Sequence, residues 1–166
     1  MAQAPVAAQT SALPPVAQAQ EAQQQIAELL RRYAHATDLI AADSAANEAD
    51  VEATYRRIFT ADAKIGVRGQ MSVSGPAAWL ELVKASTGAL RGSQHMLGSQ
   101  VVEVGRLPNA EGLGGEATIT SYLQATRVGA DGDVSRVLGT YLATASHSAE
   151  SGWQIAELML EVLALD

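Results

Sequence analysis

Four long stretches of β-favouring residues in the second half of the chain limit the folds that this sequence can adopt. They are rich in Val, Ile, Thr, Leu and Tyr and cover roughly residues 93–105, 115–128, 134–147 and 153–164. Residues typical of turns separate them, namely Pro108-Asn109 with nearby glycines, Gly129-Ala130-Asp131-Gly132-Asp133, and Ser151-Gly152. Because such short connections join antiparallel neighbours, we predict a four-stranded meander. Residues 157–164 also contain good helix formers, but a strand there completes the meander, and we predict a strand.

The part of the chain before these stretches has the periodicity of helices. Apolar side chains recur at i, i+3, i+4 and i+7 over residues 21–41, which predicts an amphipathic helix. A short strand is expected around residues 63–67. Two further helices are expected: residues 48–60, capped by Asn47 or Asp50, and residues 75–89, opened by Ser74-Gly75-Pro76. This order predicts an α+β fold, with three N-terminal helices packed on a strongly curved antiparallel sheet.

The first twenty residues differ from the rest of the chain in composition. Residues 2–20 contain only Ala, Gln, Pro, Val, Ser, Thr and Leu, with neither charged nor aromatic side chains. Their prolines disfavour a continuous helix, so we expect a disordered leader over residues 1–20 and one domain over residues 21–166. The leader resembles the N-terminus of a bacterial exported protein after signal-peptide cleavage, and an ordinary disordered terminus explains it equally well. The compartment, bacterial cytoplasm or periplasm, stays open.

The composition argues against several classes of partner. The 166 residues include 11 Lys and Arg against 18 Asp and Glu, a formal net charge of −7, without a basic cluster. Contact with a nucleic-acid backbone needs a positive face, so no nucleic-acid partner is expected. No apolar run reaches the roughly 18 residues of a membrane-spanning helix, so no membrane partner is expected.

The composition and the motifs also argue against bound metals and cofactors. The chain has no cysteine, which excludes disulfides, thiol catalysis and Cys-ligated metal sites. His35 and His147 have no partner at the spacing of a metal site. The glycine-rich residues 111–115 lack the strand–loop–helix context of a phosphate-binding loop. We therefore expect neither a metal nor an organic cofactor.

Several local motifs follow one another in an order that a known family shares. They are Tyr33-Ala-His-Ala-Thr-Asp38, Ile58-Phe59-Thr60-Ala61-Asp62-Ala63, Ser93-Gln94-His95-Met96-Leu97-Gly98, Gly139-Thr140-Tyr141 and Gly152-Trp153-Gln154-Ile155. Over about residues 22–164 the chain resembles the SnoaL-like branch of the nuclear-transport-factor-2-like superfamily, which contains scytalone dehydratase and bile-acid 7α-dehydratase. The resemblance implies the cone-shaped fold of that superfamily. Its members commonly form dimers or trimers through the outer face of the sheet, and the apolar last strand fits such a homo-oligomer.

The resemblance implies roles for an aspartate and a histidine that lie far apart in the sequence. In the dehydratases of this branch, an aspartate late in the first helix and a histidine on the first long strand form a dyad inside the cone. Carried over to this chain, Asp38 orients the ring of His95, and His95 takes the proton. A histidine suits this task because its pKa lies near neutral pH, and a carboxylate stabilises the imidazolium that forms. Tyr33 would donate a hydrogen bond to a substrate oxygen.

The remaining predicted site residues are expected to bind the substrate. Alternate residues of a strand share one face, so Leu97, Ser99 and Val101 are expected beside His95 on the cavity side. The other predicted binding residues are Tyr55, Thr120, Tyr122 and Tyr141. Many relatives have asparagine where this chain has Ser99. Scytalone dehydratase has a second histidine on the next long strand, and bile-acid 7α-dehydratase has an aspartate there. In this chain Thr120 is the nearest candidate, and its hydroxyl is a poor base.

Two functions from different classes fit these residues. The first is a cofactor-independent lyase or isomerase, such as a dehydratase, that acts on a small, mostly apolar or aromatic compound bearing a hydroxyl or carbonyl group. The second is a non-catalytic ligand-binding or assembly domain of the same fold. Tyr33, Asp38 and His95 favour the enzyme, whereas Ser99 and the missing second acid or base favour the binding domain. A hydrogen bond between Asp38 and His95 in a closed apolar pocket would favour the enzyme.

Overall fold

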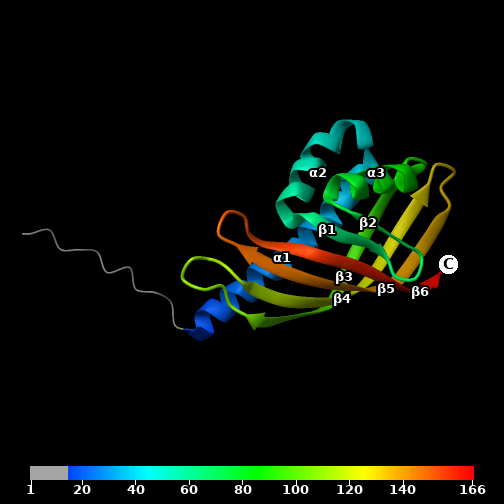
Figure 1. The fold of residues 1–166 in the computed structure, drawn as a ribbon. Helices are drawn as coiled ribbons and strands as arrows, with labels where there is room; N and C mark the ends of the chain where they lie inside the picture. The colour runs from blue at the N-terminus through cyan, green and yellow to red at the C-terminus, as the bar shows by residue number, and fades with distance from the viewer. Residues whose placement is uncertain (1–14) are drawn as a thin grey trace, which may run out of the picture.

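The structure is a computed structural model that describes residues 15–166, and it combines three helices with a six-stranded sheet (Figure 1). The elements in chain order are α1 (Pro15–Ala42), α2 (Ser44–Ile58), β1 (Phe59–Val67), β2 (Met71–Ser74), α3 (Pro76–Thr87), β3 (Leu90–Arg106), β4 (Gly115–Gly129), β5 (Val134–Ser148) and β6 (Gly152–Leu165). This arrangement confirms the predicted α+β class, with three helices towards the N-terminus and the four long strands of a curved sheet after them.

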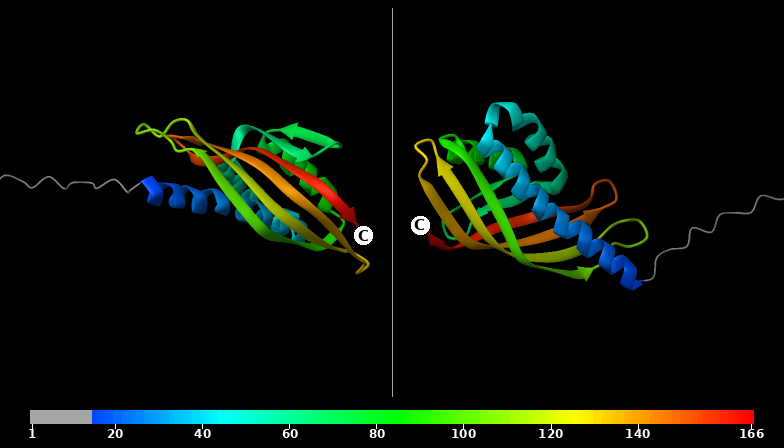
Figure 2. Two further views of the ribbon diagram at one scale, coloured as in Figure 1. Left: turned by 90° about the horizontal axis from the view of Figure 1, so that it is seen from below. Right: turned by 180° about the vertical axis from the view of Figure 1, so that it is seen from behind.

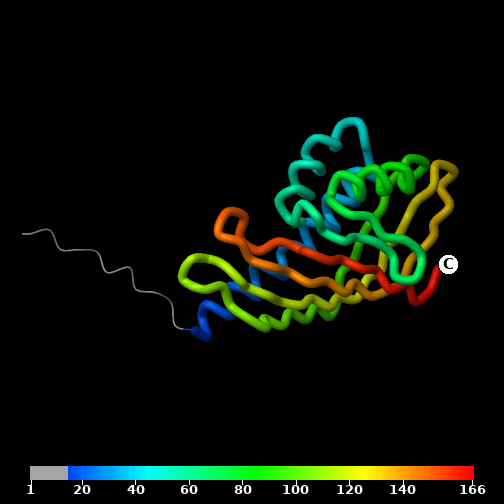
Figure 3. Tube along the Cα trace, in the orientation of Figure 1, coloured from blue at the N-terminus to red at the C-terminus, as the bar shows by residue number. Residues whose placement is uncertain are grey.

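The four long strands form the predicted meander. The strand order in the sheet is β2-β1-β6-β5-β4-β3, and each of the pairs β3–β4, β4–β5 and β5–β6 is antiparallel. The assignment of the last segment to a strand is thereby confirmed. Strand β1 extends the sheet by pairing in parallel with β6, and the short β2 folds back on β1 as a hairpin beside α3 (Figure 3).

Bulges in the long strands accompany the curvature of the sheet. Between Gly98 and Val101, strand β3 has one residue more than its partner β4, and Ser99 there has a φ of 46°. A second shift lies in β6 between Ile155 and Glu157, opposite β5. An extra residue on one strand bends that strand and increases the local twist. The curled sheet leaves one face for helix α1, which crosses it diagonally (Figure 2).

Several boundaries differ from the predicted ones. Helix α2 spans Ser44–Ile58 rather than residues 48–60, and β1 begins directly after it at Phe59 rather than near residue 63. Helix α1 begins at Pro15 rather than Glu21. A proline fits the first position of a helix because its φ is preset and the N–H that it lacks would have no intrahelical partner there. Of the predicted disordered leader, residues 1–14 lie outside the described residues. Asp43, not Asn47 or Asp50, caps α2 by accepting a hydrogen bond from the backbone N–H of Ala46 at 3.0 Å.

None of the helices over residues 15–166 is both long enough and apolar enough to cross a membrane.

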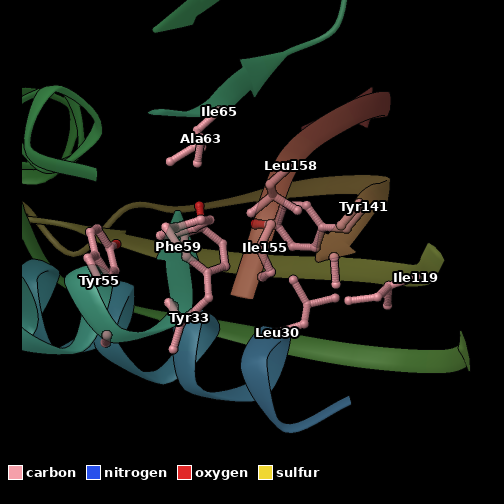
Figure 4. Close-up of a cluster of buried hydrophobic side chains, with 14 of the residues drawn as sticks. Leu30, Tyr33, Tyr55, Phe59, Ala63, Ile65, Ile119, Tyr141, Ile155 and Leu158 are labelled. Carbon is pink, nitrogen blue, oxygen red and sulfur yellow. The ribbon is translucent and has the colours of Figure 1, made fainter. Parts of the chain in front are cut away.

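Aromatic side chains of α1, α2, β1 and β5 pack together where α1 lies against the sheet (Figure 4). The ring of Tyr33 on α1 lies 5.7 or 5.8 Å, centroid to centroid, from the rings of Tyr55, Phe59 and Tyr141. All four side chains are buried. Tilted and edge-to-face contacts of this kind add to the stabilisation that burial provides. They determine how the C-terminal half of α1 lies against the sheet, and with it the position of the site described below.

Exposed apolar side chains on the long strands favour the predicted homo-oligomer. Met96, Val101 and Tyr122 are exposed at 55%, 54% and 60%, and Leu163 on β6 is more exposed still. Burying such side chains in a subunit interface stabilises the assembly. We expect light scattering at micromolar concentration to give a mass of at least a dimer. A monomer under these conditions would contradict the prediction.

Candidate active site

A cavity of about 440 Å³ lies between the sheet and helices α1 and α3. Much of its wall is apolar, with Leu82, Val83, Leu123, Val137 and Leu158 among the lining residues. The larger polar side chains that reach it are Tyr33, Trp79, His95, Arg127 and Tyr141. An apolar cavity with a few polar groups is the usual form of a small-molecule site.

Asp38 and His95 are in direct contact at this cavity. Nδ1 of His95 on β3 lies 2.6 Å from Oδ1 of Asp38 in α1. The backbone N–H of His95 donates to Oδ2 of the same carboxylate at 2.9 Å, and the Ser93 hydroxyl donates to Oδ1 at 2.6 Å. The side chains of His95 and Asp38 are exposed at only 8% and 21%. These contacts hold the imidazole in one orientation, as the dyad predicted from the resemblance requires.

The protonation of this pair follows from its hydrogen bonds. Burial raises the pKa of Asp38, but the hydrogen bonds from His95 and Ser93 outweigh burial and leave that pKa below its ordinary value of 3.8. An ionised carboxylate only accepts hydrogen bonds, so Nδ1 of His95 carries the proton. In the neutral ring, Nε2 then has a free lone pair, and no described residue hydrogen-bonds to it. Nε2 is therefore available to take a proton from a ligand.

The lowered pKa of Asp38 leads to a prediction about stability and pH. A carboxyl whose pKa is lower in the folded state contributes stability above its unfolded-state pKa, and this contribution is lost as the pH falls through the folded-state value. We therefore expect the free energy of unfolding of wild type, relative to Asp38→Asn, to decrease as the pH falls from about 5 to about 2. Urea denaturation of both proteins across this range measures the difference. A difference that does not change with pH would contradict the prediction.

Two buried tyrosines supply hydroxyl groups to the cavity. The Tyr33 hydroxyl accepts a hydrogen bond from Nε1 of Trp79 at 3.2 Å. Burial raises the pKa of Tyr33 and raises that of Tyr141 well above its ordinary value. Both hydroxyls therefore stay protonated at neutral pH, and they also interact with each other. The structure places both predicted residues, Tyr33 and Tyr141, at the cavity wall.

The bulge at Ser99 moves two predicted residues away from the cavity side. The inward positions of β3 run through His95 and Leu97 and then continue at Gln100 and Val102, while Ser99 and Val101 are exposed. The predicted alternation is wrong after Gly98 because the extra residue reverses the direction of every side chain beyond it. Leu97 does face inward, but it packs against the hydrophobic core and does not line the cavity.

Three more of the predicted binding residues lie elsewhere. The inward positions of β4 include Ile119, Ser121 and Leu123, so Thr120 and Tyr122 point to the outer face. Tyr55 is fully buried outside the cavity lining, with its hydroxyl 2.7 Å from that of Thr37. In contrast to the prediction, these three side chains therefore do not line the cavity.

Arg127 and Trp79 are two of the cavity residues that were not predicted. Arg127 follows Leu123 and Ala125 at every second position on the inward face of β4, and a strand alternation extended to the end of β4 would have indicated it. Trp79 on α3 lines the cavity and donates a hydrogen bond to the Tyr33 hydroxyl. Within residues 15–166, no three His, Asp or Glu side chains gather as metal ligands would.

Comparison with known proteins identifies what this chain is similar to. Residues 18–159 match the sequence model of a SnoaL-like domain. No curated protein gives a significant match.

Solved structures of the same fold come from several proteins. A candidate scytalone dehydratase from Novosphingobium aromaticivorans has a TM-score of 0.71 and 14% identity, over 91% of this chain and 90% of that one. An NTF2-like protein with a cystatin-like fold from the same species has a TM-score of 0.66 and 23% identity, over 87% and 83%. A type 2 hexachlorocyclohexane dehydrochlorinase (LinA) has a TM-score of 0.65 and 11% identity, over 89% and 91%. At these identities the likeness is one of fold.

Proposed function

This chain belongs to the SnoaL-like domain family and has an NTF2-like fold, and from that premise we propose that it is a cofactor-independent lyase or isomerase. The proposed substrate is a small, mostly apolar compound with a hydroxyl or carbonyl group. Its reaction begins with proton removal by His95, which Asp38 orients. The observation that carries the proposal is the 2.6 Å contact between Nδ1 of His95 and Asp38 at an apolar cavity.

The proposed reaction needs only one acid–base group. Nε2 of His95 removes a proton from carbon, and the electron pair of that C–H bond forms the new double bond. In a dehydration, the C–O bond to the leaving oxygen breaks, and the imidazolium returns its proton to that oxygen, so that water leaves. In an isomerisation, the imidazolium returns the proton to another carbon. Asp38 stabilises the imidazolium between the two transfers.

The tyrosines have a distinct role in this scheme. Because burial raises the pKa of Tyr33 and of Tyr141, their hydroxyls act as hydrogen-bond donors rather than as bases. A donor aimed at a carbonyl or a leaving oxygen stabilises the negative charge that develops there. Two structural neighbours support the reaction class by name, since a dehydratase eliminates water and a dehydrochlorinase eliminates hydrogen chloride.

A second candidate function is a ligand-binding domain without catalysis. One observation favours it. Around the described cavity, His95 is the only side chain that could act as a base near neutral pH, and the neighbouring inward positions of β4 hold Leu123 and Ala125. Such a domain would bind the same apolar compounds and release them unchanged.

Turnover distinguishes the two functions. Hydroxylated aromatic, steroid and polyketide compounds are incubated with wild type and with His95→Gln, and the products are analysed by mass spectrometry. We expect wild type to convert at least one compound and His95→Gln to leave it unchanged. Binding of these compounds by wild type without conversion of any of them would favour the ligand-binding domain.

A further inference from the structure

Arg127 is a charged group of the cavity that the proposed reaction does not use. It lies near the end of β4, directly opposite Ser93 of β3, and its side chain lines the cavity wall. The residue two positions before it, Ala125, pairs with His95. Diagonal neighbours on one face of a sheet have Cα atoms about 7–8 Å apart, so long side chains can reach the same ligand from both positions. Arg127 and His95 are such neighbours.

The positive charge of Arg127 has no compensating partner in the described residues. None of the ion pairs within 4.0 Å includes Arg127, and its side chain makes none of the hydrogen bonds found there. None of the Asp and Glu side chains of residues 15–166 lines the cavity, and Asp38 already accepts hydrogen bonds from His95 and Ser93. A guanidinium has five N–H donors and loses free energy when they are removed from water without acceptors. The half-buried guanidinium of Arg127 therefore needs a hydrogen-bond acceptor, and a bound ligand can provide one.

The field of Arg127 reaches the two tyrosine hydroxyls. Burial raises the pKa of Tyr33 and of Tyr141, and the positive charge of Arg127 acts in the opposite direction on both. Arg127, Tyr33 and Tyr141 also line the same cavity. A negatively charged oxygen of a ligand in this cavity would be attracted by the guanidinium.

We propose that Arg127 binds a carboxylate of the ligand, so that the molecules taken by this cavity are aromatic or alicyclic carboxylic acids. The planar guanidinium matches a carboxylate with two parallel hydrogen bonds. The apolar body of the acid lies against Leu123, Val137 and Leu158, which are buried or line the wall. With the acid bound, Asp38 keeps its hydrogen bonds from His95 and Ser93, and the guanidinium of Arg127 is paired with the carboxylate of the ligand. The proposal rests on the proposed function for placing the reacting carbon at His95.

The surroundings favour a carboxylate over a phosphate. Arg127 is the only Arg or Lys among the residues that line the described cavity, and the chain carries a net charge of −7. A phosphate monoester carries nearly two charges at neutral pH and would leave about one of them unpaired in an apolar wall. A single carboxylate is balanced by a single guanidinium.

Binding of matched acids and amides tests the proposal without any turnover. The probes are 2-naphthoate and 9-anthroate, each compared with its primary amide by isothermal titration calorimetry. We expect wild type to bind each acid about 10- to 100-fold more tightly than the amide, as charge-assisted hydrogen bonds would give. Arg127→Gln should bind acid and amide equally. Arg127→Lys keeps the charge but loses the planar pair of donors, and should keep only part of the preference.

The matched control is Arg91→Gln, which removes an exposed arginine of β3 that does not line the cavity, and it should keep the full preference. Equal binding of acid and amide by wild type, or a preference that survives in Arg127→Gln, would overturn the proposal. If Arg127→Gln does not fold, Arg127→Lys tests the proposal instead. An unchanged preference for the acid over the amide in Arg127→Lys would exclude the paired hydrogen bonds between the guanidinium and the carboxylate. A protein that prefers the acids but converts no compound would refute the lyase or isomerase and leave the role of Arg127 intact.

Discussion

Replacing His95 with glutamine is expected to lower the turnover of a confirmed substrate by about 10²- to 10⁴-fold, the usual contribution of a general base. Glutamine keeps much of the size of histidine but has no group that accepts a proton near neutral pH. The His95 side chain is only 8% exposed and is hydrogen-bonded to Asp38. Because so little solvent reaches this position, a water molecule would not readily replace the imidazole as the base. The measurement is kcat for wild type and variant on the same compound.

A control with the same substitution separates the loss of a base from a general effect. His35 is exposed on α1, and it does not line the cavity that His95 lines. His35→Gln should therefore keep wild-type turnover. The affinity of His95→Gln for the substrate should change much less than its turnover, because the apolar wall is intact. If His95→Gln retained near-wild-type kcat, the histidine would have a structural role and the chemistry would lie elsewhere.

Replacing Asp38 with asparagine is expected to lower turnover by about 10²-fold or more. The substitution keeps the size but removes the charge that stabilises the imidazolium of His95. It also places an amide that can donate to Nδ1, which favours the tautomer with the proton on Nε2 and so removes the base. In the triad of serine proteases, the corresponding change of the orienting aspartate costs about 10⁴-fold in turnover. The Asp62→Asn variant, with the same change at an exposed position, should retain wild-type turnover.

The double variant tests whether Asp38 and His95 act as one unit. Residues that work together in one step are not additive, so Asp38→Asn combined with His95→Gln should be little slower than His95→Gln alone. The free energy of unfolding should change little or rise, because a buried charged pair is seldom an efficient way to stabilise a fold. Multiplication of the two single effects in the double variant would mean that each residue acts independently. Near-wild-type turnover of both single variants would refute the dyad.

Local patterns were sufficient for most elements of this fold. Stretches rich in β-favouring residues, separated by turn residues, predicted the strands β3 to β6, and each of them spans the predicted stretch with shifts of a few residues at the ends. The short strand β2 was not predicted. The helices were predicted from apolar positions at helical spacing, and the start of α1 was missed because Pro15 was taken as a helix breaker. The parallel pairing of β1 with β6 was not predicted, since it joins segments far apart in the sequence.

Some residues of the site could be predicted from local motifs, and others depend on contacts between distant segments. Motifs resembling a known family indicated Tyr33, Asp38 and His95, and each of these residues now lies at or beside the cavity. Motifs could not indicate Arg127 or exclude Thr120, because which face of a strand is inward depends on its register with the neighbouring strand. A single bulge at Ser99 changes that face for the rest of β3.

The sequence by itself thus determined the order and type of the elements, because hydrophobic periodicity and turn residues act over a few neighbouring positions. Only the tertiary structure decided which side chains meet. Asp38 and His95 are 57 positions apart, and they touch because the cluster of Tyr33, Tyr55, Phe59 and Tyr141 seats α1 on the curled sheet. The inward position of Arg127 likewise follows from the pairing of β4 with β3 and β5. Packing and strand register are properties of contacts between distant segments, and no local pattern encodes them.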